Sequence, residues 1–100
     1  MKKGTTPRHK FTIPIPVSEI VDAEITYCQN RKEILKKHLN ECQTGDDFIQ
    51  FKLTQEETFL FDESANVEIQ LRVLTNGSDC YASDIFSIPC KRCLSKDVLT

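Results

Sequence analysis

The segment at residues 67–73 constrains the fold of this chain more than any other. It reads Val-Glu-Ile-Gln-Leu-Arg-Val, with apolar and polar residues in strict alternation. Successive side chains of a strand point to opposite faces of a sheet, so the apolar residues share one face and the polar residues the other. Asn76 and Gly77 follow, and Asn-Gly after such a run is a strong hairpin signal. The pattern predicts a half-buried strand of an antiparallel sheet.

Similar alternation recurs earlier in the chain, at residues 11–17, 23–28 and 48–53. The first of these segments contains Pro14 and Pro16, which cannot donate hydrogen bonds to a ladder. We therefore expect residues 11–17 to lie at an edge of the sheet, with the prolines facing outward.

The strand that returns from the Asn-Gly turn should run from about residue 80 to residue 88. Its apolar residues do not keep a single phase, which predicts a β-bulge near Ser83 and Asp84. Pro89 should end this strand, and residues 90–99 are expected to form one last edge strand.

Residues 33–39 fit either of two structures. Ile34, Leu35 and Leu39 with three intervening cations suit one helical turn, whereas a strand would turn Leu35 and Leu39 inward. The polar turn at residues 29–32 connects this segment closely to the expected strand at 23–28. A hairpin is the simplest result of that short connection, so we favour a strand.

A short helix is expected after the strand at 48–53. Thr54 can accept a hydrogen bond from the amide three residues later, and Glu57 can reach back to the amide of Thr54, which is a capping box. Phe59 and Phe61 would then close one end of the fold as a short helical plug.

These segments predict an all-β protein, an antiparallel immunoglobulin-like β-sandwich of about seven strands with one short helical turn near residues 55–60. One hundred residues suit a single domain with its own core. The first ten residues hold several cations and few apolar side chains. We therefore expect a disordered basic arm at residues 1–10 and a single β-sandwich domain at residues 11–100.

Composition excludes several classes of partner and location. The formal net charge is −2, which gives no general attraction to nucleic acid or to anionic lipid. No stretch approaches the roughly 18 apolar residues of a membrane span, and no apolar run follows the first lysines as a signal peptide requires. We expect neither nucleic acid nor a membrane as partner, and no secretion by a signal peptide.

The pair Cys90 and Cys93 is the one pattern that resembles a chemical site. A C-x-x-C pair can hold half of a zinc site or act as a dithiol. Zinc needs further ligands, and none of the other cysteines or histidines forms a second pair. We therefore interpret the five cysteines as structural thiols and expect no metal ligand, and keep a cytosolic metal-binding or redox-sensing β domain built on Cys90 and Cys93 as the alternative.

No catalytic constellation stands out. His9 and His38 lie among cations without a neighbouring carboxylate to orient them. The chain has no glycine-rich phosphate loop and no nucleophile elbow. We expect a protein that is not an enzyme, with no catalytic residue and no cofactor.

Four segments carry a resemblance to a known group of proteins, namely residues 24–30, 53–58, 67–74 and 82–85. In this order and spacing the chain resembles small proteins encoded in tail or baseplate modules of phages and prophages of Gram-positive bacteria. Those proteins are similar to the N-terminal β-sandwich domain of phage baseplate upper proteins. The resemblance covers residues 11–99, and its motifs belong to the fold and not to a catalytic site.

The resemblance implies a structural or adaptor component of a phage tail or baseplate that acts through protein contacts. Its partners would be other phage structural proteins and a second copy of this chain, in the virion or in the host cytoplasm during assembly. An unpaired sheet edge is a template for another strand. We therefore expect the contact surface at the edge formed by residues 11–17, together with the helical plug at residues 59–61. Its candidate residues are Phe11, Ile13, Ile15, Val17, Phe59 and Phe61.

Overall fold

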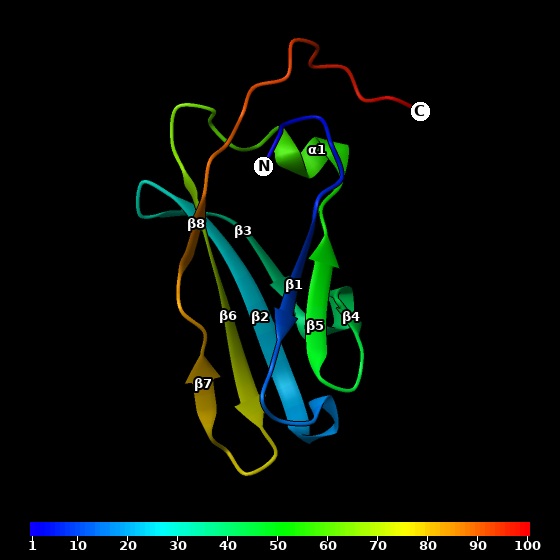
Figure 1. Cartoon of the computed structure of the whole chain (residues 1–100), viewed down its shortest axis with the longest axis vertical. Helices are drawn as coiled ribbons and strands as arrows, with labels where there is room; N and C mark the ends of the chain where they lie inside the picture. The colour runs from blue at the N-terminus through cyan, green and yellow to red at the C-terminus, as the bar shows by residue number, and fades with distance from the viewer.

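Two antiparallel sheets packed face to face make up the computed structural model, which describes all 100 residues (Figure 1). The strands are β1 (Arg8–Thr12), β2 (Ile20–Gln29), β3 (Lys32–His38), β4 (Gln43–Thr44), β5 (Phe48–Lys52), β6 (Val67–Thr75), β7 (Cys80–Ala82) and β8 (Phe86–Ile88). The helices are α1 (Gln55–Thr58) and two 3-10 turns, η1 (Val17–Glu19) and η2 (Leu39–Glu41). The prediction of an all-β sandwich with a helical turn near residues 55–60 is confirmed.

The two sheets differ in width. The narrow sheet has the order β1-β5-β4, and the wide sheet has the order β3-β2-β6-β7 with β8 also paired to β6. Strands β2 and β6 form the centre of the wide sheet and pair with each other along most of their length. The alternating apolar residues Val67, Ile69, Leu71 and Val73 of β6 are buried, as the pattern predicts, whereas Leu74 is exposed. The four buried residues form the core with Ile25, Tyr27, Ile49 and Leu53.

The segment at residues 33–39 is a strand over most of its length, which confirms the favoured interpretation. It pairs with β2 through a tight turn in which Asn30 and Arg31 have φ angles of 51° and 63°. Two central residues with positive φ give the turn a twist that matches the twist of the flanking strands. Asparagine tolerates this region of φ better than most residues, which suits the turn.

The predicted bulge lies between β7 and β8. Arg72 is the partner of Ala82, whereas Ile69 is the partner of Phe86, so the register shifts by one residue between the two strands. Ser83 bridges the shift, because its amide donates to the Leu71 carbonyl at 2.8 Å and its hydroxyl accepts from the Leu71 amide at 3.0 Å. The side chain thus replaces the ladder bond that the extra residue would otherwise break.

The expectation of a disordered arm is wrong for the residues just before position 11. Strand β1 begins at Arg8, the Pro7 carbonyl accepts from the Leu53 amide, and Lys2 bridges to Lys91. The physical reason is that alternate residues of β1 turn inward, so that Phe11 packs on the core although the cations Arg8 and Lys10 lie in the same strand.

The expected strand at residues 11–17 also ends early. Strand β1 stops at Thr12, and Pro14 and Pro16 lie in a connection that leads into η1. Neither proline can donate to a neighbouring strand, so the ladder cannot continue past Ile13. Ile13 nevertheless keeps one bond, from its amide to the Asp47 carbonyl, and its side chain is buried.

The last strand expected at residues 90–99 is absent. Lys91 makes one isolated bridge to Lys2, and the remaining C-terminal residues are irregular. They cross the end of the sandwich above α1 (Figure 1), where the Gln55 amide group holds the Leu99 backbone with bonds of 2.9 and 2.8 Å.

Candidate interaction site

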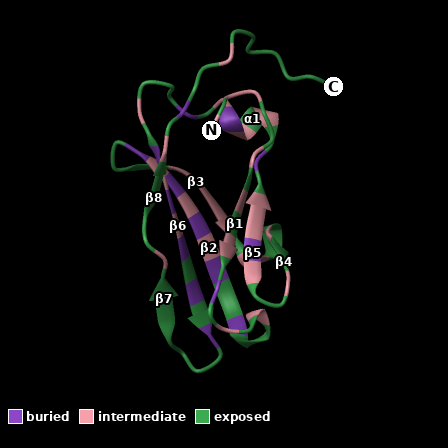
Figure 2. Ribbon diagram, viewed as in Figure 1, coloured by how far each residue is buried: buried purple, intermediate pink, exposed green.

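The inner face of the wide sheet is not completely covered. Tyr81 is the cross-strand partner of Val73, and Phe86 is the partner of Ile69, so each pair shares one face. Val73 and Ile69 are only 6% and 3% exposed, whereas Tyr81 and Phe86 are 56% and 51% exposed. Strand β7 is accordingly drawn as exposed in Figure 2. The narrow sheet lacks a strand that would cover β7 and β8.

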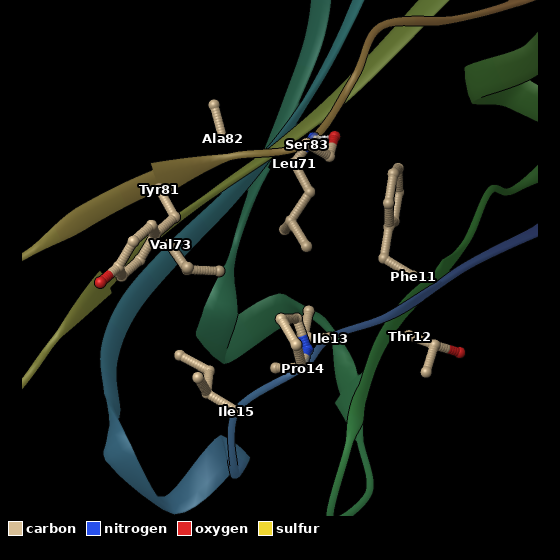
Figure 3. A pocket seen from close by; sticks show the side chains of 10 residues that line it. All are labelled: Phe11, Thr12, Ile13, Pro14, Ile15, Leu71, Val73, Tyr81, Ala82 and Ser83. Carbon is tan, nitrogen blue, oxygen red and sulfur yellow. Dashed lines mark hydrogen bonds between the residues drawn. The ribbon is translucent and has the colours of Figure 1, made fainter.

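A cavity of about 470 Å³ opens where this cover is missing (Figure 3). Its walls come from β1 and the connection after it on one side, and from β6 and β7 on the other. The side chains of Phe11, Ile13 and Leu71 surround the open space, whereas Thr12 points away from it. The complete lining is Phe11, Thr12, Ile13, Pro14, Ile15, Leu71, Val73, Tyr81, Ala82 and Ser83.

A second hollow continues this cavity along β1 toward β8. It is lined by β1 together with Ile69, Phe86 and Ile88, and it shares Phe11 with the first. The ring centroids of Phe11 and Phe86 lie 5.7 Å apart, so these two rings lie at the boundary between the two hollows. We call the combined depression between β1 and the β7–β8 segment the open groove.

The backbone edge that borders the open groove is unpaired. Ile13 donates to Asp47 and Pro7 accepts from Leu53, so the odd-numbered residues of β1 direct their backbone groups toward β5. In an antiparallel pair the alternate residues direct their N–H and C=O groups the other way. The backbone groups of Arg8, Lys10 and Thr12 therefore point to the free side of β1.

The outer face of the narrow sheet carries uncompensated positive charge. Arg8 lies directly opposite Lys52, and neither forms a salt bridge with an acidic residue. Lys10 is unpaired as well, and its ammonium group lies 4.3 Å from the centroid of the Phe48 ring. Like charges directly opposite each other on a sheet are destabilising. This arrangement costs stability in the isolated chain.

The outer face of the wide sheet shows the opposite arrangement. Glu24 lies between two cations, 3.1 Å from Arg72 and 3.7 Å from Lys36. Lys36 also pairs with Glu33 at 3.1 Å, and this hydrogen bond, followed by the charges of the two acids, raises the pKa of Lys36. The cations Lys36 and Arg72 on this face are therefore paired with acidic residues of the same chain.

His9 points from β1 into the sandwich, where its Nδ1 lies 2.9 Å from the Tyr27 hydroxyl. Burial, with Cys42 and Glu57 nearby, raises the pKa of Tyr27 far above its ordinary value, so this hydroxyl stays protonated. Burial and then the N-terminal ammonium group lower the pKa of His9. A neutral imidazole that accepts from Tyr27 fits both shifts, and this pair is a structural contact of the core.

The structure divides the six residues predicted for the contact surface. Phe11, Ile13 and Ile15 meet in the open groove, and Val17 packs against the core as η1 begins. Phe59 lies half-buried beside α1, where it lines a separate hollow with the C-terminal residues. The inclusion of Phe61 is wrong, because its side chain is 1% exposed and packs against the Tyr27 ring.

Sequence reasoning missed Tyr81 and Phe86 as residues of the groove. The one available signal was the phase change near Ser83, because the bulge is what places both aromatic side chains on the inner face. Their exposure depends on the width of the opposite sheet, which no local pattern of residues encodes.

The two cysteines of the C-x-x-C pair both follow β8 in the chain, in the irregular C-terminal segment. Cys90 is 6% exposed and Cys93 is half-buried, and both thiols are free. Burial raises the pKa of Cys90, which disfavours the reactive thiolate. No group of three or more His, Cys, Asp or Glu side chains lies close enough together to hold a metal ion.

Comparisons with models of known families, with curated proteins and with solved structures find no match to this chain. No helix of the structure has the length and apolar character needed to cross a bilayer. The open groove lies beside an unpaired backbone edge and a basic outer face, and this combination suits contact with another chain.

Proposed function

We propose that this chain is a non-enzymatic structural or adaptor protein of a phage or prophage tail or baseplate, and that it acts through protein contacts. The open groove carries this proposal. It combines apolar side chains such as Phe11 and Tyr81 with a free backbone edge, and both features are typical of surfaces that bind another chain. The sequence resemblance supplies the biological setting.

The partners in this proposal are other structural proteins of the particle, and its location is the virion or the host cytoplasm during assembly. A rigid sandwich suits this role because the groove lies between elements fixed by the core, so that a partner meets a preformed surface. The residues assigned to the contact are Phe11 and Ile15 from the predicted set, with Tyr81 and Phe86 added by the fold.

The alternative function, a metal-binding or redox-sensing domain, has less support. It depends on Cys90 and Cys93, of which the first is buried in the core. Zinc quantification on reduced protein purified without chelator tests it, and about one zinc per chain would favour the alternative over the assembly role.

The deciding experiment is quantitative mass spectrometry of particles purified from an induced culture of the strain that encodes the chain. We expect the protein in particles, or bound to tail assembly intermediates, in a fixed ratio to a known tail protein. If it is absent from both fractions while it is expressed in the cell, the proposed function is wrong.

A variant in the groove sharpens that experiment. Ile13 is unsuitable because it is buried, so we choose Ile15→Glu with Tyr81→Glu, two residues that line the cavity with exposed surface. Leu94→Glu is the matched control, since Leu94 is 90% exposed and lies outside the groove. The double variant should be lost from particles while the control is retained, with both proteins folded by circular dichroism.

A further inference from the structure

We propose that an extended segment of another protein binds along β1 as a fourth strand of the narrow sheet, with apolar side chains facing the open groove and acidic side chains on the outer face. This inference rests on the proposed function as a contact protein, and it specifies the chemistry of the partner. Addition of a strand to a sheet edge is a recurring mode of peptide recognition.

The backbone of β1 is available for such a strand. The N–H and C=O groups of Arg8, Lys10 and Thr12 point to the free side, so each residue offers one donor and one acceptor. Pro7 precedes this edge and Pro14 follows it, and neither can donate. The open stretch therefore fits about five residues of a partner, roughly the length of an ordinary strand.

The free side of β1 faces the part of the wide sheet that lacks cover. On the opposite side of the sandwich, the Lys37 ammonium of β3 lies 5.1 Å from the Phe51 ring of β5, so β5 lies toward β3. Phe11 of β1 meets Phe86 of β8, so β1 lies toward β8. A strand added next to β1 would continue the narrow sheet over β7 and β8.

The inner side chains of the partner should be apolar. They would enter the cavity of about 470 Å³ and cover Tyr81 and Phe86, which are now more than half exposed. Burial of an aliphatic side chain in such a space favours binding, because apolar surface leaves water. Two or three inward residues of a short strand are enough to use this space.

The outer side chains of the partner should be acidic. They would stand beside Arg8 and Lys10, which have no acidic neighbour in this chain. Carboxylates there would also offset the repulsion between Arg8 and Lys52. Opposite charges directly across two paired strands stabilise the pairing.

The same charges disfavour a second copy of this chain as the occupant. Pairing of two β1 edges would place the Arg8 and Lys10 side chains of one copy beside those of the other on the same face. Cationic residues at an edge are a known means by which proteins avoid such self-pairing. The occupant is therefore a different, acidic segment.

The first test uses a synthetic nine-residue peptide in which Val and Glu alternate, and a control peptide in which Lys replaces Glu. Amide hydrogen exchange is followed by NMR on the full chain. We expect the Glu peptide to slow exchange of the Lys10 and Thr12 amides by at least about tenfold. The amides of His9 and Phe11 serve as internal controls, because they already bond to β5 and should be slow throughout.

The second test reverses charge at the edge. Arg8→Glu with Lys10→Glu should lower affinity for the Glu peptide about tenfold and give binding of the Lys peptide. The matched control is Lys32→Glu with Lys96→Glu, two exposed cations outside the groove that change the net charge equally. This control should bind the Glu peptide as the unmodified chain does.

Three outcomes would overturn the inference: no change at the β1 amides with the Glu peptide at millimolar concentration, equal binding of both peptides, or self-association through β1 in sedimentation. These results are separate from the fate of the proposed function. A chain found in particles without peptide binding keeps the function and loses this docking mode. A chain that binds the peptide and is absent from particles keeps the docking site and loses the assembly role.

Discussion

The two long sides of the sandwich are held by different interactions. We call the side that contains β3 and α1 the closed side, and the side that contains β1 and the open groove the open side. On the closed side, β3 is tied to α1 by an ion pair of 2.8 Å between Lys37 and Glu57. The hydrogen bond that the Lys37 ammonium donates to the Glu57 carboxylate is the main cause that raises the pKa of Lys37. For Glu57, burial alone would raise the pKa, but the bonds from Lys37 and from the Thr54 backbone outweigh it and lower the pKa. On the open side, Arg8 and Lys10 have no such partner.

The ends of the closed side are also fixed by buried polar contacts. Gln29, which is 4% exposed, donates to the carbonyls of Asp62 and Ala65 at 2.7 and 3.1 Å and accepts from the Asp62 amide at 2.8 Å. All three partners of the Gln29 side-chain amide are backbone groups of the loop before β6. No side chain that lines the open groove makes three hydrogen bonds to one loop. The difference teaches that ion pairs and buried hydrogen bonds hold the closed side together, whereas the cations of β1 on the open side have no acidic partner in the chain.

The largest expected difference between the two sides comes from removing one aromatic ring from each. Phe61→Ala should lower the free energy of unfolding by about 3–5 kcal/mol, because Phe61 is buried against Tyr27. Phe86→Ala on the open side should cost less than about 1 kcal/mol, since half of that ring is already exposed. Urea denaturation of both variants measures the two losses. Equal losses of unfolding free energy would show that Phe86 contributes as much to the stability of the core as Phe61.

The next effect concerns the anchor of the closed side. Gln29→Ala should lower the free energy of unfolding by about 2 kcal/mol, because it removes three hydrogen bonds and leaves backbone groups of the Asp62–Ala65 loop without partners. Gln70→Ala is a suitable control, since that side chain makes one bond, to the Ser83 carbonyl. A larger loss for the control would contradict the assignment of Gln29 as the anchor.

Much of the closed side could be predicted from the sequence. Strand β6 shows its alternation directly, and the capping box formed by Thr54 and Glu57 is present as expected. Both features depend on residues that are close together along the chain. Strand periodicity and helix capping are set by residues within one short segment, so they can be predicted from the sequence.

The open side could not be predicted to the same extent. Strand β1 begins within residues whose charge suggests a solvated arm, and its inward positions include His9, which is not an apolar signal. The groove exists because one sheet is narrower than the other, and sheet width depends on pairing between segments far apart in the chain. Phe61 was assigned to the surface for a related reason, since its burial needs the Tyr27 ring across the sandwich.

A smaller effect concerns pH and the inward face of β1. Because burial first, and the N-terminal charge second, lower the pKa of His9 in the folded state, the unfolded chain binds more protons below the ordinary value of 6.5. The free energy of unfolding should therefore fall as the pH is lowered from 7 to 5.5, by at most about 1.4 kcal/mol per pH unit. The carboxylates with lowered pKa, such as Glu57, act only below their ordinary value of 4.5.

Chemical denaturation of the unmodified chain and of His9→Gln at pH 7, 6 and 5.5 measures this dependence. The variant should lose most of the slope, because His9 is the histidine whose pKa is lowered by burial against Tyr27. An unchanged slope in His9→Gln would mean that another group titrates in this window and that the His9–Tyr27 contact does not control acid stability.

The smallest expected effect is the one that separates stability from recognition most directly. Arg8→Glu replaces a like-charge contact with Lys52 by an opposite-charge pair, and should raise the free energy of unfolding by a few tenths of a kcal/mol at low salt. Arg72→Glu on the other sheet should lower it by a similar amount, because Arg72 lies opposite Glu24. Both effects should vanish at molar salt.

The result for Arg8→Glu also bears on binding. If this variant is more stable but binds the acidic peptide more weakly, the positive edge is maintained at a cost to stability. A binding surface predicts this result, and an inert edge does not. A destabilised Arg8→Glu variant would mean that Arg8 makes a favourable contact within the chain. An acidic partner would then not be needed to account for its positive charge.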